Sequence, residues 1–73
     1  MAKRKRDVEK EYPKAEFVAK LRRLADALES KQPFSIQVAG ERLHIGADTH
    51  FNIEHERAGT KHELEFQLRW RDE

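Results

Sequence analysis

The sequence has no cysteine, which excludes disulfide bonds and thiolate ligands for a metal or a redox centre. No apolar run approaches the length of a membrane-spanning helix, and no apolar stretch follows the basic N-terminal residues as it does in a signal peptide. Only three glycines are present, and they form no phosphate-binding motif. These absences predict a cytoplasmic protein that does not enter a membrane.

Apolar residues are also scarce, at 37% of the 73 residues, whereas charged residues make up 40%. Such a chain has room for one domain with a thin core between two layers. The net charge of +1 hides an asymmetry, because Lys3, Arg4, Lys5 and Arg6 leave eleven Lys and Arg against fourteen Asp and Glu in the remainder. We therefore expect a basic, flexible arm over residues 1–6 and an acidic domain over residues 7–71.

The segment after Pro13 has the three- to four-residue apolar spacing of an amphipathic helix. Its apolar stripe consists of six residues within about 120° of the helical wheel: Phe17, Val18, Leu21, Leu24, Ala25 and Leu28. Charged residues lie away from the centre of that stripe on the helical wheel. Pro13 suits a helix start, since its missing N–H would be unpaired there. The pattern predicts one helix with a single buried stripe, ending near Ser30.

After the helix, apolar residues recur at every second position, which is the period of a strand with one buried face. Gly40 favours a tight turn, and we place it at the first central position. That turn pairs Val38 with Leu43 and Ile36 with Ile45. The segment is therefore predicted to form a first hairpin.

A second hairpin is predicted with its turn at Ala58 and Gly59. The resulting cross-strand pairs are Phe51 with Phe66, Ile53 with Leu64, and His55 with His62. On the other face this register places Glu54 opposite Glu63. Together with Glu65 these carboxylates would share a proton, which would raise the pKa of one of them.

Residues 7–12, DVEKEY, have a weaker strand pattern with Val8 and Tyr12 in phase. The predicted order is strand, helix and four further strands. This is an α+β fold in which one helix packs on one face of a mainly antiparallel sheet. The predicted core consists of Phe17, Leu21, Leu24, Leu28, Ile36, Val38, Leu43, Ile45, Phe51, Ile53, Leu64, Phe66, Leu68 and Trp70.

Three segments in this order, LRRLADALES, FSIQVAGERLHI and ELEFQLRW, resemble the amphi-Trp domain family of small prokaryotic proteins. The resemblance covers about residues 7–71 and implies a compact α+β domain. It implies no activity, cofactor or catalytic residue. Two positions depart from the family pattern: Lys31 stands where we expect Gly after the helix, and Gly46 stands where Pro often follows the strand.

His55 and His62 are the candidate metal ligands, because they are cross-strand neighbours in the predicted register. A structural zinc site normally has four protein ligands, and His44 faces the opposite side of the sheet. We therefore interpret the two histidines as half-covered residues at the rim of the core and predict no metal site. A metal-responsive domain is the second alternative function.

No residue pattern indicates catalysis or a bound cofactor. The two serines lie at the helix end and on a strand, at Ser30 and Ser35, and there is no cysteine. The carboxylates lie on an open sheet face without a desolvated pocket. We therefore predict that the protein is not an enzyme.

Nucleic-acid binding is the first alternative function. Lys3, Arg4, Lys5 and Arg6 are its candidate contacts, because clustered cations bind phosphates without regard to sequence. An RNA platform also needs exposed aromatic residues, and the aromatic residues of the strands all have inward parity in this sequence. We therefore expect any such binding to be weak and non-specific.

The interpretation that we favour is a non-catalytic protein-interaction module. It would bind a partner protein or its own copy through an exposed edge strand. Trp70 ends the alternating pattern of the last strand, and we interpret it as the lid at one end of the core, with its indole N–H near water or a backbone acceptor.

Overall fold

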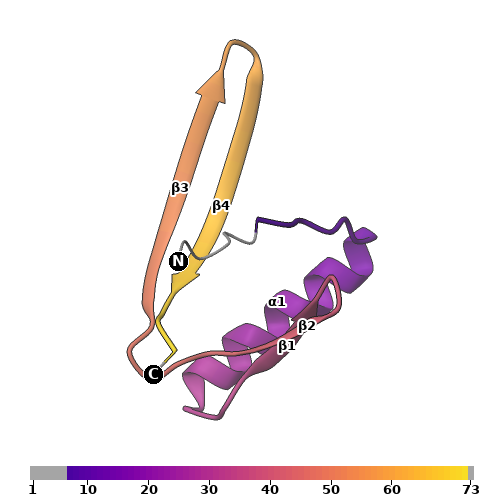
Figure 1. The fold of residues 1–73 in the computed structure, drawn as a ribbon. Helices are drawn as coiled ribbons and strands as arrows, with labels where there is room; N and C mark the ends of the chain where they lie inside the picture. Colours follow the sequence, from indigo (N-terminus) through magenta and orange to yellow (C-terminus); the bar gives the residue numbers. More distant parts are fainter. Residues whose placement is uncertain (1–6, 73) are drawn as a thin grey trace, which may run out of the picture.

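The computed structural model describes residues 7–72. Within this range the chain forms helix α1 (Lys14–Glu29) and then strands β1 (Ser35–Val38), β2 (Glu41–His44), β3 (His50–Ala58) and β4 (Lys61–Arg69) (Figure 1). The predicted helix and the four strands after it are confirmed, and the fold is α+β. Among the described residues, no helix has the length and apolar character that crossing a lipid bilayer demands.

The strand predicted at residues 7–12 was wrong, because this part of the described chain has no regular secondary structure. Only two of its six residues are apolar, so burial contributes little to hold it against a strand edge. Its tyrosine contacts cations instead: the ammonium groups of Lys10 and Lys20 lie 5.4 and 4.9 Å from the centre of the Tyr12 ring.

The end of α1 explains why glycine is expected at position 31. The backbone N–H of Gln32 donates to the carbonyl of Ala27 at 2.9 Å, and that of Lys31 donates to the carbonyl of Leu28 at 3.3 Å. These two bonds define a Schellman motif, which requires a left-handed residue just after the helix. Lys31 occupies that position with φ 58°, a conformation that a side chain disfavours and glycine adopts freely.

We expect Lys31→Gly to raise the free energy of unfolding by about 1 kcal/mol, because glycine removes the steric cost of the left-handed conformation. For a domain of this size the change corresponds to a rise of roughly 4–8 °C in Tm. Thermal denaturation followed by circular dichroism measures it. Lys31→Ala keeps the Cβ atom and is the matched control. A glycine variant no more stable than this alanine variant would contradict the interpretation.

The first hairpin forms, but its predicted register was wrong by two residues. Ile36 pairs with Leu43 and Val38 pairs with Glu41, so the turn contains only Ala39 and Gly40. Both turn residues have positive φ, 46° and 88° respectively. This combination is the signature of a type I′ turn, whose twist matches that of the flanking strands. Gly40 therefore takes the second central position rather than the first.

The second hairpin also differs from the predicted register by two residues. The pairing runs from His50 with Arg69 to Ala58 with Lys61, which leaves Gly59 and Thr60 in the turn. Gly59 has φ 64° at the first central position, where turns of type II′ favour glycine. A shift by two keeps every side chain on its predicted face, because side chains alternate with a period of two.

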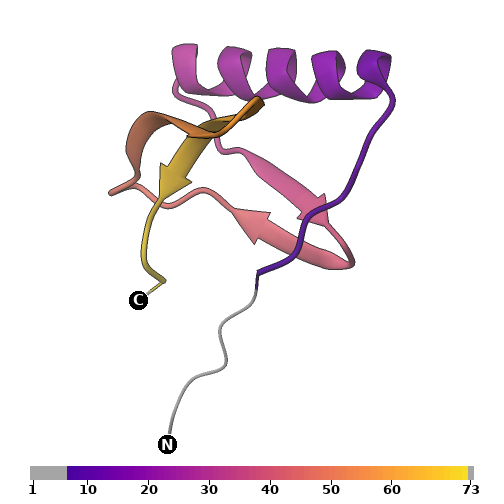
Figure 2. The same cartoon turned by 90° about the horizontal axis from the view of Figure 1, so that it is seen from above.

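The four strands form two separate two-stranded sheets within the described chain, β1–β2 and β3–β4, and not the single sheet that we expected. Helix α1 lies over the β1–β2 hairpin, and the longer β3–β4 hairpin extends away from them (Figures 1 and 2). Arg23 joins the helix to the first hairpin. Its Nη1 donates to the carbonyl of Ser35 at 3.1 Å, and its guanidinium lies 4.8 Å from the centre of the Phe34 ring.

The core is smaller than predicted. Phe34, which the predicted core omitted, is the only buried hydrophobic side chain among the described residues, with 6% of its surface exposed. Seven predicted core residues are half-buried: Leu24, Ile36, Val38, Leu43, Ile45, Leu68 and Trp70. Seven others are exposed in this single chain, contrary to the prediction: Phe17, Leu21, Leu28, Phe51, Ile53, Leu64 and Phe66. Four of these seven lie on the extended second hairpin, whose apolar face has little cover from the other described residues.

Candidate functional site

The β3–β4 hairpin is amphipathic, and its apolar side is open to solvent. The register places Phe51 beside Leu68, Ile53 beside Phe66 and His55 beside Leu64 on one face. We call Phe51, Ile53, Leu64 and Phe66 the hairpin face. The exposed fraction of these side chains runs from 58% for Phe51 to 64% for Ile53 and Phe66. Four large apolar residues on a two-stranded sheet therefore have little cover in the single chain.

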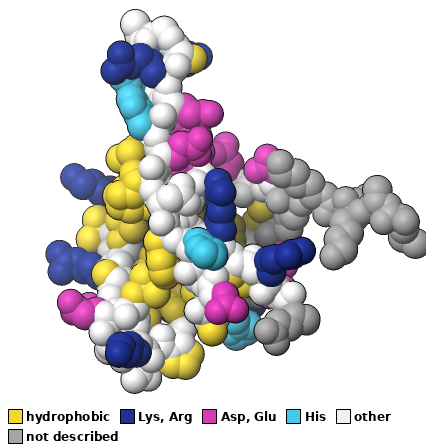
Figure 3. All heavy atoms as spheres, turned by 90° about the vertical axis from the view of Figure 1, so that its left-hand side faces the viewer, with side chains coloured by type: hydrophobic (Ala, Val, Ile, Leu, Met, Phe, Trp, Pro, Cys, Tyr) yellow, Lys and Arg dark blue, Asp and Glu magenta, His cyan; other side chains and the backbone are white. Residues whose placement is uncertain are grey.

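A second apolar surface lies between α1 and the β1–β2 hairpin. This apolar groove has a volume of about 390 Å³. It is lined by residues that include Phe17 and Leu21 of α1, Ile36 and Leu43 of the first hairpin, and Leu68 and Trp70 from the end of β4. Because Leu68 pairs with Phe51, the groove continues into the hairpin face. Figure 3 shows the hydrophobic side chains as a band that runs down this side of the molecule from below the hairpin tip.

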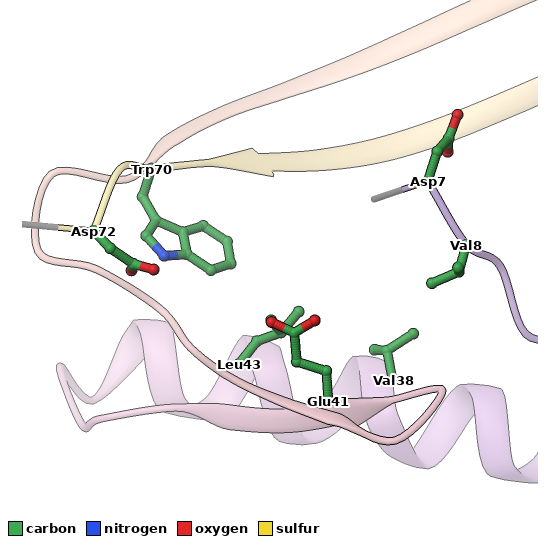
Figure 4. Close-up of a pocket in the computed structure, with 7 residues that line it drawn as sticks. All are labelled: Asp7, Val8, Val38, Glu41, Leu43, Trp70 and Asp72. Atoms are coloured by element: carbon green, nitrogen blue, oxygen red, sulfur yellow. The ribbon is translucent and has the colours of Figure 1, made fainter. Parts of the chain in front are cut away.

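Trp70 lies where the two surfaces meet. It is half-buried and follows directly after β4. Its indole points into the space between the end of β4 and the first hairpin, opposite Val38 and Leu43, with Asp72 beside it (Figure 4). The role of Trp70 as a lid at one end of the core remains a prediction. The ring lines the apolar groove. It also lines the more polar pocket of Figure 4, which Val38, Leu43 and Asp72 line as well.

Gly46 gives the indole room to approach. A Cβ atom at this position would lie 3.0 Å from Cδ1 of Trp70 and 3.3 Å from Cβ and Cγ of the same residue. The proline expected here from the family pattern has such an atom, so it would require the tryptophan to shift. Glycine at position 46 therefore fits the close contact between the loop before β3 and the end of β4.

The opposite face of the β3–β4 hairpin is polar and carries four carboxylates. Glu54 pairs with Glu65 and Glu56 pairs with Glu63, so the predicted opposition of Glu54 and Glu63 was wrong. Gln67 organises this face. Its Nε2 donates to Glu54 at 3.1 Å and to Glu65 at 2.6 Å, while its Oε1 accepts from Asn52 at 2.7 Å and from Arg69 at 3.2 Å.

The pKa values of Glu63 and Glu65 shift in opposite directions, so one carboxylate of this group has a raised pKa. The hydrogen bond with Glu65 and the negative charge of that neighbour raise the pKa of Glu63 above its ordinary value of 4.5. The same bond lowers the pKa of Glu65. The raised pKa contributes stability below pH 4.5, and this contribution is lost as the pH rises through the folded-state pKa. The lowered pKa of Glu65 acts in the opposite sense, and its contribution is lost as the pH falls.

His55 and His62 contact each other although they are not paired residues. In the observed register His55 lies opposite Leu64 and His62 lies opposite Arg57, so the two histidines are diagonal neighbours. Nε2 of His55 lies 2.9 Å from Nδ1 of His62, and the ring planes differ by 2°. The ring centroids lie 5.2 Å apart. This separation equals the 2.9 Å between the two nitrogens plus the distance from each nitrogen to the centre of its own ring, so the two centroids and the two nitrogens lie on one line. The rings therefore lie edge to edge in one plane and share an N–H···N hydrogen bond.

This geometry is that of a hydrogen bond rather than of a metal site. Two nitrogens that bind one tetrahedral zinc ion at 2.0–2.1 Å lie about 3.4 Å apart, which is wider than the 2.9 Å between His55 and His62. Within residues 7–72, no group of three or more His, Cys, Asp or Glu could hold a metal ion. Both histidines are exposed, so the expected half-covered rim position was wrong for the single chain.

The candidate nucleic-acid contacts Lys3, Arg4, Lys5 and Arg6 lie outside the described residues. Phe51 and Phe66 are exposed in the single chain, so the expectation that the aromatic residues of the strands all point inward was wrong. Their face of the hairpin carries one Lys or Arg residue, Arg57, among its paired positions. A single cation is fewer than normally accompanies stacking aromatic residues in a groove that binds single-stranded nucleic acid.

The model of the Amphi-Trp domain family matches residues 1–73. The match includes residues 1–6, which precede the domain boundary expected from the sequence. No curated protein and no solved structure matches the chain.

Proposed function

This chain belongs to the Amphi-Trp domain family, and from that premise we propose that it is a non-catalytic protein-interaction module whose docking surface is the hairpin face. The observation that carries the proposal is the exposure of Phe51, Ile53, Leu64 and Phe66 side by side on one hairpin. Large contiguous apolar patches are rare on monomeric soluble proteins, and where they occur they mark interaction sites.

The architecture of the hairpin supports the same proposal. An isolated two-stranded hairpin is at best marginally stable in water and needs packing against another element. Each strand of the second hairpin has nine residues, so most of its apolar side extends beyond the groove formed by α1 and β1–β2. A protein docked on the hairpin face would supply the missing packing.

The chemistry of the charged groups favours binding over catalysis. The acidic residues with shifted pKa values, Glu63 and Glu65, lie on the open polar face of the hairpin. A catalytic carboxylate normally lies in a cleft, where exclusion of water tunes its pKa and strengthens its interaction with the substrate. The proposal therefore gives these residues the role of keeping one face of the hairpin in water.

Docking through the hairpin face differs from the edge-strand docking expected from the sequence. An edge contributes backbone hydrogen bonds, whereas a face contributes apolar area. The side-chain exposure of the second hairpin supports face docking, and edge docking remains a prediction.

Site-specific photo-cross-linking in the cells that naturally express the protein tests this function. A photoreactive phenylalanine analogue at Phe66 should cross-link to another protein chain, because this residue is 64% exposed on the hairpin face. The same analogue at Glu56, on the polar face of the paired strand, is the matched control and should give little product. Equal yields at the two positions, or no product at Phe66, would contradict the proposed docking surface.

A further inference from the structure

The surface of this chain is too large for a compact monomer. Its solvent-accessible area is 7319 Å², whereas a compact protein of 8.7 kDa exposes about 4,700 Å². Its Cα radius of gyration of 14.2 Å likewise exceeds the value of about 11 Å for a compact chain of this length. The chain therefore leaves more surface open than its size requires.

The excess is large enough for an interface. Seven fully extended residues of this composition account for at most about 1,300 Å², so the undescribed residues do not explain the whole difference. About 1,300 Å² per chain remains. A stable protein–protein interface of standard size buries about 800 Å² on each partner. The surplus area is thus sufficient for one such interface.

The open area includes two surfaces of the same chemistry. The hairpin face presents Phe51, Ile53, Leu64 and Phe66, and the apolar groove beside it presents Phe17 and Leu21, which are also exposed. A two-fold axis would let each copy place its hairpin face against the groove and helix of the other copy. Symmetric dimers use the same surface twice in this way. Stacking of the two hairpin faces alone would leave both grooves open.

We propose that a second copy of this chain occupies the hairpin face, so that the protein is a two-fold dimer in which the hairpin face of each copy packs against the apolar groove of the other. This proposal rests on the proposed interaction function and names its partner. Phe17 and Leu21 of one copy are covered by Phe66 and Ile53 of the other. The groove of one chain is completed only by the hairpin of its partner.

The oligomeric state of the full chain is the first test. Sedimentation equilibrium should give twice the chain mass of 8.7 kDa at micromolar concentrations. The double variant Ile53→Lys/Phe66→Lys should weaken dimerisation by roughly 100-fold or more, because it places two charges in the apolar contact. Asn52→Lys/Glu56→Lys, on the polar face of β3, is the matched control and should leave the dimer intact.

A second test does not depend on the stability of the lysine variants. Because the chain has no cysteine, Phe17→Cys and Phe66→Cys can be made separately and mixed under mild oxidation. A disulfide between the two variants can form only between chains, and we expect it in high yield. A mixture of Phe17→Cys with Glu56→Cys should give little. Preferential Phe66→Cys homodimers would overturn the reciprocal packing.

The outcomes separate this inference from the proposed function. A chain that remains monomeric at about 100 μM, a concentration well above the Kd of a micromolar dimer, overturns the dimer. If photo-cross-links from Phe66 to a different protein persist in that case, the interaction function stands. A monomer without such cross-links overturns both.

Discussion

Replacement of Trp70 by alanine should lower the Tm by roughly 10–20 °C. Truncation of a buried tryptophan costs about 3–5 kcal/mol, and the half-buried position of Trp70 reduces this to about 2–3 kcal/mol. For a chain of this length each 1 kcal/mol corresponds to roughly 4–8 °C. The loss is severe because the indole packs beside Gly46 and, between the end of β4 and the first hairpin, lies opposite Val38 and Leu43.

Thermal and urea denaturation measure this effect. Trp70→Phe is the control, because it keeps an aromatic ring and should lose much less stability. Trp70 is the single tryptophan of the chain, so its emission in the wild type reports directly on this contact and should shift to longer wavelength on unfolding. An alanine variant that unfolds at the wild-type temperature would show that the indole does not hold the second hairpin to the rest of the chain.

Phe34→Ala should lower the free energy of unfolding by about 3–4 kcal/mol. Phe34 is the only buried hydrophobic residue among those described, and the guanidinium of Arg23 lies over its ring. Its carbonyl also accepts a hydrogen bond from the N–H of Ile45 at 3.0 Å, which ties together the segments that flank the first hairpin. A stability of about 4–11 kcal/mol is typical for this length, so the loss should remove at least about a quarter of the free energy of unfolding.

Phe17→Ala provides the comparison, since it removes the same ring from a position that is 53% exposed. At low protein concentration, where copies are separated, Phe17→Ala should cost about 1 kcal/mol or less. Urea denaturation at two protein concentrations distinguishes the variants. The effect of Phe34→Ala should be similar at both, whereas that of Phe17→Ala should grow with concentration if Phe17 lies in a dimer. Equal effects of the two variants in dilute solution would contradict the assigned core.

Local patterns in the sequence predict the elements well but not the pairing of the strands. The apolar spacing around Phe17 and Leu21 and the start signal at Pro13 are sufficient to place the helix. Register depends on which residues enter a turn, and here Ala39 adopts positive φ although alanine disfavours it. A pattern of period two cannot distinguish registers that differ by two residues, because both keep the same face.

The histidine pair shows that a site can be predicted for an incorrect reason. The sequence places His55 opposite His62, and the structure brings them together as diagonal neighbours instead. Both are on the same face in either register, and long side chains can meet across a diagonal. The edge-to-edge geometry of their rings depends on rotamers, for which the sequence has no signal.

The predicted core failed where it required long-range information. Parity correctly places Phe51 and Phe66 on the apolar side of their strands, but parity does not indicate which element covers that side. Coverage depends on how β3–β4 is oriented relative to α1, which the five residues between β2 and β3 determine. Phe34 carried a usable signal, since it begins the alternation that continues at Ile36 and follows directly after Pro33.

The separation of the strands into two hairpins also affects how the chain folds. Each strand pairs only with its neighbour in sequence, across a turn of two residues, so little loop-closure entropy opposes either pairing. Helices and hairpins of this kind form within microseconds. The contact made by Trp70 is different, because it joins the end of β4 to Gly46 and the segment around Leu43. We therefore expect the helix and the two hairpins to form first. The packing of Trp70 against Gly46 and the first hairpin is then the step that joins them into one cooperatively folded domain.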